Sequence, residues 1–211
     1  MIPPCVSASS GAALEAARET LERGALILYP TDTLYAVGGR VFDDRVATAV
    51  RRAKGRADDK PLPIIVANLE QVRQVAAGLP QTLMVLAERF WPGPLTLVLS
   101  AANAVPKEVT AGTGRVAVRI PALDFARRLC DQGGPLIATS ANRSGEPAAS
   151  TLDEALRAMG EYVALAIDGG ASLESRPSTI VDLTGDTPRL LRAGAVVWET
   201  VLRALGERYP R

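Results

Sequence analysis

The sequence predicts an α/β fold with a mixed sheet and flanking helices, in one domain of 211 residues. Two observations support this prediction. Short apolar runs that are typical of strands alternate along the chain with segments of helical periodicity. Several predicted strands also follow one another without an intervening helix, which favours a mixed sheet over a purely parallel one.

The first half of the chain contains seven predicted elements. Asp43 or Asp44 caps the second helix, and Gly55 ends it after Lys54. The strand that follows contains Pro63, so its first half is expected at a sheet edge. The elements are a helix over 11–23, a strand over 25–29, a helix over 43–54, a strand over 62–66, helices over 69–77 and 81–90, and a strand over 95–100.

The second half continues the same pattern. Thr151 and Glu154 form the signature of a capping box, which predicts the start of a helix. In the strand predicted over 116–120, the alternation of side chains places Ala117 and Arg119 on one face. The elements are strands over 116–120 and 135–139, with a helix over 123–130 between them, a helix over 151–159, strands over 163–167, 179–183 and 189–191, and a helix over 196–205.

Composition excludes several classes of function. The net charge of +1 argues against general affinity for nucleic acid. The chain has no histidine, so Ser-His-Asp and Cys-His nucleophile systems are excluded. Cys5 and Cys130 lie far apart without metal-ligand spacing, which favours a reduced, cytoplasmic protein. No apolar run reaches the roughly 18 residues that span a membrane, and we expect no signal peptide.

One short stretch concentrates an unusual residue type. The chain has three lysines among 24 basic residues, and Lys54 and Lys60 flank Arg56. Lysine is a compact point charge suited to phosphate, so the stretch predicts a polyanion or nucleotide-phosphate site. The alternative is that cations at a helix C-terminus offset its dipole. That alternative explains Lys54, but not Arg56 or Lys60.

Polar clusters follow two of the predicted strands. Residues 31–33 come after the strand over 25–29, and residues 140–145 come after the strand over 135–139. Ligands commonly bind where strands of α/β sheets end, although such residues also dominate solvated turns. Arg119 and Arg192 have the same ambiguity, because each either binds an anion or faces solvent.

These pieces, taken in order, resemble the YrdC family of threonylcarbamoyl-adenylate synthases. The matching segments span residues 29 to 194, within a motif-bearing core of about 10–205. They are Tyr-Pro-Thr-Asp-Thr-Leu-Tyr-Ala-Val-Gly at 29–38, Lys-Gly-Arg at 54–56, Lys-Pro-Leu at 60–62, Trp-Pro-Gly-Pro-Leu-Thr at 91–96, Val-Ala-Val-Arg-Ile-Pro at 116–121, Ser-Ala-Asn at 140–142, Ser-Gly at 144–145, Pro-Ser-Thr-Ile-Val-Asp at 177–182 and Leu-Arg-Ala-Gly at 191–194.

The resemblance implies a single twisted α/β domain over 1–211, with a mixed sheet around a concave, positively lined cavity. It implies that L-threonine, bicarbonate or CO2, and ATP give threonylcarbamoyl-AMP and pyrophosphate, with Mg2+ on the ATP phosphates. The product would pass to a complex that modifies adenosine-37 of tRNA. Weak contact with tRNA or double-stranded RNA is a further partner that the resemblance leaves open, and no membrane is involved.

The resemblance also assigns roles to individual residues. The set expected to hold L-threonine is Thr33, Arg119 and Ser178. The set expected to bind ATP is Lys54, Arg56, Lys60, Ser140, Asn142 and Arg192, with Lys54 and Arg56 as the catalytic cations. The chain departs from the family pattern at Ala57 and Ala148, where relatives often have Pro and Ser.

Two other functions remain open at this point. YrdC-like domains also occur in carbamoyl-transfer proteins that handle a carbamoyl adenylate, usually together with metal-binding domains. A double-stranded RNA or ribosome-associated binding protein is the second alternative, against which the near-neutral charge and the 4% aromatic content argue.

Overall fold

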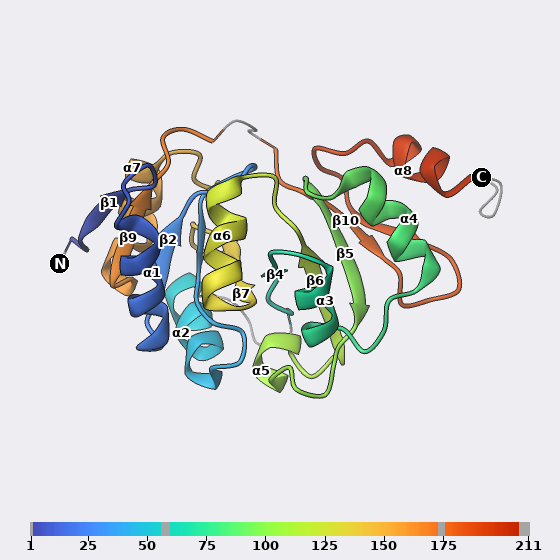
Figure 1. Ribbon diagram of the computed structural model, residues 1–211, viewed down its shortest axis with the longest axis horizontal. Helices are drawn as coiled ribbons and strands as arrows, with labels where there is room; N and C mark the ends of the chain where they lie inside the picture. Colours follow the sequence, from blue (N-terminus) through green and yellow to red (C-terminus); the bar gives the residue numbers. More distant parts are fainter. Residues whose placement is uncertain (1, 56–59, 173–175, 207–211) are drawn as a thin grey trace.

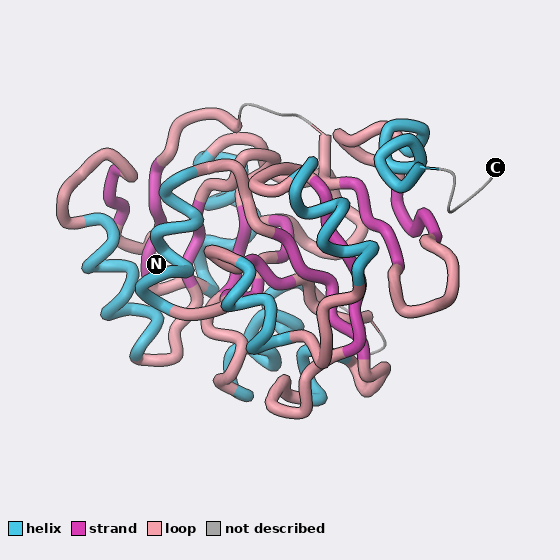
Figure 2. Tube along the Cα trace, turned by 45° about the vertical axis from the view of Figure 1, so that its right-hand side comes forward, coloured by secondary structure: helices cyan, strands magenta, loops and turns pink. Residues whose placement is uncertain are grey.

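The computed structural model describes residues 2–55, 60–172 and 176–206. Its strands form two mixed sheets, one of five strands and one of six, with helices packed against both (Figure 1). Figure 2 shows the arrangement in a second view, in which strands run through the middle and helices lie around them. The predicted α/β class with mixed strand pairing is therefore confirmed, although hydrogen bonding divides the strands between two sheets.

The five-stranded sheet has the order β1-β9-β2-β3-β8. Its strands are Cys5–Ser7 (β1), Ile27–Tyr29 (β2), Ala36–Gly38 (β3), Thr139–Ser140 (β8) and Leu165–Asp168 (β9). The first three in spatial order are parallel, whereas β3 is antiparallel to both β2 and β8. The short connection between β2 and β3 therefore leaves the polar residues 31–33 at one end of this sheet.

The six-stranded sheet has the order β11-β10-β5-β6-β4-β7. Its strands are Ile64–Ile65 (β4), Leu95–Ser100 (β5), Arg115–Arg119 (β6), Leu136–Ile137 (β7), Thr179–Asp182 (β10) and Arg189–Arg192 (β11). Side chains alternate across each strand, so Leu97 and Val118 are buried in the core on one face. Thr96, Ala117 and Arg119 share the opposite face, as the sequence predicted for the last two.

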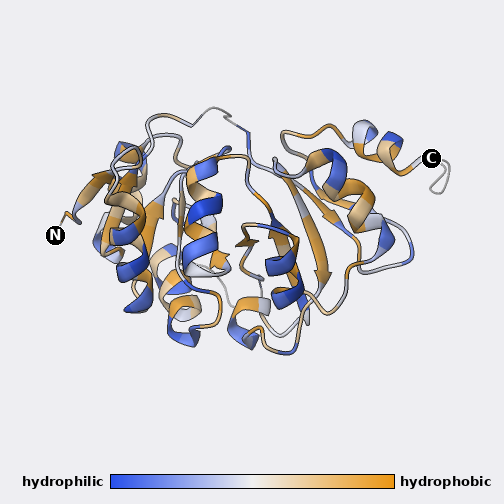
Figure 3. Cartoon of the chain, viewed as in Figure 1, coloured by the Kyte–Doolittle hydropathy of each residue, from blue (hydrophilic) through white to orange (hydrophobic). Residues whose placement is uncertain are grey.

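The helices are Ala13–Glu22 (α1), Asp44–Lys54 (α2), Leu69–Val75 (α3), Gln81–Phe90 (α4), Lys107–Thr110 (α5), Asp124–Gly133 (α6), Leu152–Met159 (α7) and Trp198–Leu205 (α8), with a 3-10 turn over Gly160–Tyr162 (η1). Leu21 of α1 and Leu129 of α6 are buried together with Tyr29 in one of the two hydrophobic clusters of the core. In Figure 3, where the ribbon is coloured by hydropathy, α1 and α6 show hydrophilic segments in blue beside hydrophobic ones in orange. No helix of the described ranges could cross a membrane.

Local signals in the sequence set several helix ends. Asp43 caps α2 by accepting a hydrogen bond from the Arg45 amide, which decides between the two predicted caps. Gly55 ends the same helix with a φ of 57°, a left-handed conformation that glycine adopts at little cost. The predicted capping box of Thr151 and Glu154 is present at the start of α7.

The chain crosses from one sheet to the other between β7 and β8. β7 pairs with β4 in the six-stranded sheet, and β8 pairs with β3 in the five-stranded sheet. Ile137 anchors the crossing, because its amide donates to the Gly39 carbonyl and its carbonyl accepts from the Tyr29 hydroxyl. The approach is close enough that a Cβ on Gly38 would lie 1.7 Å from the Ile137 carbonyl oxygen. Backbone contact of this kind requires glycine at position 38.

Three expectations from the sequence differ from the structure. The strand predicted over 135–139 is divided between the two sheets. The strand predicted over 62–66 is confined to Ile64–Ile65. This strand pairs with β6 on one side and with β7 on the other, so the sheet edge predicted for the first half of the segment is wrong. The elements β1, β3 and α5 were not predicted, because each is only three or four residues long and its sequence pattern is too short to recognise.

Candidate functional site

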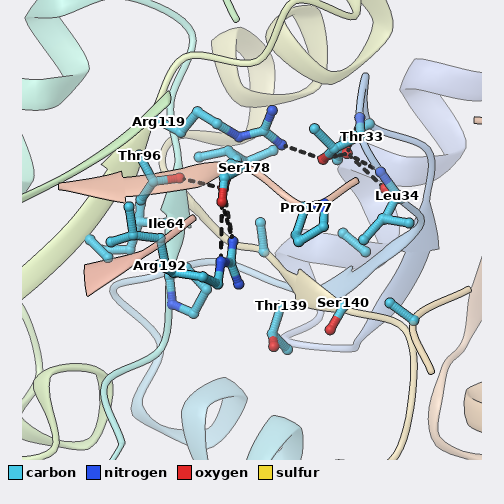
Figure 4. Close-up of a pocket in the computed structure, with 18 of the residues that line it drawn as sticks. Thr33, Leu34, Ile64, Thr96, Arg119, Thr139, Ser140, Pro177, Ser178 and Arg192 are labelled. Atoms are coloured by element: carbon cyan, nitrogen blue, oxygen red, sulfur yellow. Dashed lines mark hydrogen bonds between the residues drawn. The ribbon is translucent and has the colours of Figure 1, made fainter. Parts of the chain in front are cut away.

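A cavity of about 620 Å³ lies between the two sheets, and Figure 4 shows the side chains that line it. The β2–β3 connection forms one wall, and strands β5, β6 and β10 form the other. The crossing segment closes it from a third side. The polar lining residues are Thr31, Thr33, Tyr35, Thr96, Arg119, Thr139, Ser140, Ser178 and Arg192.

Arg119 lies at the end of β6 and forms a buried ion pair with Asp32. Its Nη1 lies 2.8 Å from Asp32 Oδ1 and 2.9 Å from Oδ2, and both side chains are at most 10% exposed. Its Nη2 donates to Thr33 Oγ1 at 3.3 Å. A charged pair of this kind fixes the guanidinium in one orientation. Arg119 therefore lies against the wall formed by residues 31–33, and it also lines the cavity.

Arg192 approaches the same cavity from β11. It donates to the Ser178 carbonyl from Nε and Nη2 and to Ser178 Oγ from Nη2, and Ser178 Oγ in turn hydrogen-bonds Thr96 Oγ1 (Figure 4). No carboxylate of the described residues forms an ion pair with it. Burial, and then the positive charge of Arg119, lower the pKa of the Arg192 guanidinium. Arg192 is exposed at the cavity, and a guanidinium group held there by neutral groups is suited to an anionic ligand.

Lys54 lies beneath the loop that follows β8. Its ammonium group donates to the Ser140 carbonyl at 2.6 Å, to the Asn142 carbonyl at 2.6 Å and to Asn142 Oδ1 at 3.0 Å. Asn142 Oδ1 also accepts from the Ser140 hydroxyl, and Asn142 Nδ2 donates to two further carbonyls of the loop. These bonds give Lys54 and Asn142 a clear role in shaping the loop.

The structure brings together most of the residues predicted for the site. Five line the cavity: Thr33, Arg119, Ser140, Ser178 and Arg192. Lys54 and Asn142 are buried against the loop and are absent from the lining, whereas exposed Lys60 lines a neighbouring cavity. Arg56 and Ala57 lie outside the described residues, so the role predicted for Arg56 stays a prediction.

The neighbouring cavity has a volume of about 860 Å³ and shares Pro61, Ala117, Ile180 and Arg192 with the first. Asp182 lies on its wall and forms ion pairs with Arg115 and Arg189. Lys60 and these two arginines make its lining strongly cationic. The two cavities therefore form one trough along the six-stranded sheet, with Arg192 where they meet.

Among the site residues that sequence reasoning missed, Asp32 and Thr96 hold the side chains of Arg119 and Ser178. Asp32 was noted as part of a polar turn, but its partner is 87 residues away and the sequence has no signal for that pairing. Thr96 was placed on a strand, and its alternation with buried Leu95 and Leu97 was the signal that it faces away from the core.

The arrangement favours binding over acid–base chemistry. The cavity presents two guanidinium groups and several hydroxyls, which hold carboxylate or phosphate groups well. Within residues 2–55, 60–172 and 176–206, no group of three acidic, cysteine or histidine side chains could hold a metal ion.

Comparisons with known proteins show which family and which folds this chain is similar to. A family model described as "Telomere recombination" and named for Sua5, YciO and YrdC matches residues 19–194. A threonylcarbamoyl-AMP synthase of Pyrococcus abyssi is 38% identical over 188 residues, which cover 89% of this chain and 55% of the relative. A putative threonylcarbamoyl-AMP synthase of Mycobacterium tuberculosis is 36% identical over 186 residues, which cover 88% of this chain and 86% of the relative.

Solved structures show the same relationship. The crystal structure of Pyrococcus abyssi Sua5 complexed with L-threonine superimposes with a TM-score of 0.93 at 35% identity, covering 98% of this chain and 62% of that one. Escherichia coli YciO gives a TM-score of 0.81 at 24% identity, covering 93% and 96%, and supports the fold alone. The chain thus spans little more than half of the Pyrococcus relative and most of the Mycobacterium one.

Proposed function

The chain belongs to the Sua5/YciO/YrdC family, and on this premise we propose that it is a threonylcarbamoyl-AMP synthase, a transferase of the nucleotidyl type. It would convert L-threonine, bicarbonate or CO2, and ATP into threonylcarbamoyl-AMP and pyrophosphate. Curated relatives carry this name, and one Sua5 structure contains L-threonine.

The observation that carries the proposal is the pair of arginines in one cavity. Arg119 is held by Asp32 and Thr33, and Arg192 is held by Ser178, so both guanidinium groups keep fixed positions. The carboxylate of an amino acid can bind to one of these guanidinium groups, and the phosphate oxygens of ATP can bind to the other. We assign the threonine to the side of Thr33, Arg119 and Ser178.

We assign the nucleotide to the side of the cavity that Ser140 and Arg192 line. Lys54 and Asn142 would support it by holding the loop after β8 in shape, through the hydrogen bonds described above. Direct phosphate contacts from Lys54, Arg56 and Lys60 remain part of the proposal. Mg2+ would bind through the ATP phosphates and offset their negative charge.

The proposed reaction has two steps. The threonine amine attacks the carbon of bicarbonate, a C–N bond forms, and water leaves to give the carbamate. A carbamate oxygen then attacks the α-phosphorus of ATP, and the bond to the β-phosphate breaks, so that pyrophosphate leaves with its electron pair. Every reactant in the second step is an anion, so fixed cations favour the reaction by offsetting repulsion and by holding the groups together.

Threonine-dependent release of pyrophosphate from ATP tests the proposal. We expect release with L-threonine and bicarbonate, and none when either is omitted. A carbamoyl-transfer protein would instead release pyrophosphate with carbamoyl phosphate and no threonine. An RNA-binding protein would release none under either condition, and both of these results would overturn the proposal.

The product is unstable in water, so we further propose that it passes to a tRNA-modifying complex that transfers the threonylcarbamoyl group to adenosine-37. On the same ground we propose a cytoplasmic location, because that is where the tRNA substrate of such a complex would be met. Transfer can be tested by adding purified tRNA and extract lacking this chain, and measuring the modified nucleoside by mass spectrometry.

A further inference from the structure

Arg51 is a buried cation in the last turn of α2 that the proposed reaction does not use. It is 8% exposed, and it lines neither of the two cavities described above. Its Nη2 donates to the Glu108 carbonyl at 2.8 Å and to the Lys60 carbonyl at 3.1 Å, and its Nε donates to the same Glu108 oxygen at 3.3 Å. A cation that only offsets a helix dipole needs no partner outside its own helix. Arg51 instead joins α2 to two other segments.

The segment that Arg51 holds leads into β4. Residues 60–63 are Lys-Pro-Leu-Pro, and the two prolines have no N–H group. Leu62 is therefore the one backbone donor of the last three residues, and its amide donates to the Val109 carbonyl of α5 at 2.8 Å. Hydrogen bonding within the sheet begins only with β4. The bridge from Arg51 is thus a second connection between this segment and α5.

Holding the Lys60 carbonyl fixes more than one oxygen atom. The carbonyl belongs to the planar peptide unit that joins Lys60 to Pro61, and this plane contains the Cα atom of Lys60. The proline that follows also restricts the backbone of Lys60 towards extended conformations. Lys60 lines the neighbouring cavity, and Pro61 lines both. The bridge therefore sets the point from which the Lys60 side chain reaches into the trough.

We propose that Arg51 is a positioning residue for Lys60, which it holds from outside the trough so that the Lys60 ammonium group can meet the phosphates of ATP. The inference rests on the proposed function, because it takes ATP as the ligand. A lysine side chain is flexible, so its contact with a phosphate is favoured when its backbone is already in place. Arg51 should therefore affect ATP, and only through Lys60.

A double-mutant cycle with Mg2+-ATP, measured by isothermal titration calorimetry, tests this dependence. We expect Arg51→Met to weaken ATP binding about fivefold, because Lys60 loses its fixed position. Lys60→Met should weaken binding at least as much, and the double variant should bind ATP no more weakly than Lys60→Met alone. Binding of L-threonine, which we assign to the other side of the cavity, should stay the same in all three variants.

The scarcity of lysine provides a direct measurement of the Lys60 side chain. The chain has three lysines, Lys54, Lys60 and Lys107, so nuclear magnetic resonance of protein labelled at lysine 13Cε gives one signal for each. Loss of a signal in Lys60→Met identifies the one that belongs to Lys60. Saturating ATP should shift this signal in wild type and shift it clearly less in Arg51→Met. A loss of stability alone would leave the shift of the folded protein unchanged.

Gln71→Ala is a matched control for the loss of a buried bridge. Gln71 is also 8% exposed, and it joins two backbone groups by accepting from the Ala67 amide and donating to the Cys130 carbonyl. It lines neither cavity, so the variant should lose stability and keep its affinity for ATP. Arg51→Lys keeps the charge with a shorter reach, so it should weaken ATP binding less than Arg51→Met, and it replaces that variant if the latter does not fold.

Two results would overturn the inference. In the first, Arg51→Met weakens ATP binding as much in the Lys60→Met background as in wild type, so that Arg51 acts independently of Lys60. In the second, the ATP-induced shift of the Lys60 signal is the same in Arg51→Met as in wild type. If the expected pattern is found but wild-type protein releases no pyrophosphate with L-threonine, the proposed function fails while this inference stands. If wild-type protein does not bind ATP, both fail.

Discussion

Replacing Asp32 with Asn removes a buried negative charge while keeping the size of the side chain. Asp32 and Arg119 are 10% and 8% exposed, so water cannot replace the lost charge. The amide oxygen of Asn can keep one of the two hydrogen bonds at 2.8 and 2.9 Å, whereas its NH2 group would face the guanidinium. The Arg119 charge is then left in a poorly hydrated site near a second arginine.

The magnitude follows from this burial. Removing one partner of a buried ion pair typically costs about 3–5 kcal/mol, and the retained hydrogen bond places Asp32→Asn near the lower value, about 3 kcal/mol. For a chain of this length each kcal/mol lowers the unfolding midpoint by about 2–4 °C, so we expect a decrease of about 6–12 °C. Thermal unfolding followed by circular dichroism measures the midpoint, and urea titration gives the free energy of unfolding.

Asp182→Asn is the matched control for this prediction. Asp182 is also a buried aspartate paired with arginine, but its partners Arg115 and Arg189 have side chains that are 50% and 68% exposed. Their charges stay hydrated when the carboxylate is lost, so we expect a cost of about 1 kcal/mol or less. Equal losses of stability in the two variants would refute the reasoning, because burial of the arginine would then not decide the cost.

Three further predictions follow from the geometry of the site. Lys54→Met should weaken ATP binding in fluorescence titrations more than Asn142→Ala does, because it removes the proposed phosphate contact as well as the support of the loop; equal losses, with a double variant no worse than either single one, would show that Lys54 acts through the loop alone. Arg192→Met should raise KM for ATP and Arg192→Lys should not restore it, since an ammonium group lacks the guanidinium fork; full recovery by lysine in steady-state kinetics would contradict this. Burial acts to raise the pKa of Asp182, but hydrogen bonds from Thr184 and Arg189 outweigh it and lower the pKa. Its contribution to stability is therefore complete above the unfolded value of about 3.9 and is lost as pH falls below it, so urea titrations should show less loss below pH 4 in Asp182→Asn than in wild type.

The alternation of apolar runs and helical patterns predicted most of the elements, because each carries its own local signal. The division into two sheets could not be predicted in this way. Residues 135–139 look like one buried strand, yet Leu136 and Ile137 pair in one sheet and Thr139 in the other. Which strands pair depends on contacts between residues far apart in the sequence, and a local run of apolar residues does not predict those contacts.

The same limit applies to the site. Arg119 was placed on the correct face by alternation, but the sequence could not show that Asp32 neutralises it. Lys54 was predicted from its residue type as a phosphate ligand, and that contact remains a prediction. The structure adds a contact that composition could not predict. The Lys54 ammonium group donates to the Ser140 and Asn142 carbonyls, because α2 ends next to the loop that follows β8.

The crossing of the chain between the two sheets has a consequence for how the protein can move. Ile137 is hydrogen-bonded to the five-stranded sheet through Gly39 and Tyr29, while its strand belongs to the six-stranded sheet. Any swing of one sheet away from the other would break these bonds at once. These bonds therefore oppose separation of the cavity walls, and a search for new substrate preferences by mutagenesis should vary the side chains on those walls rather than the crossing between β7 and β8.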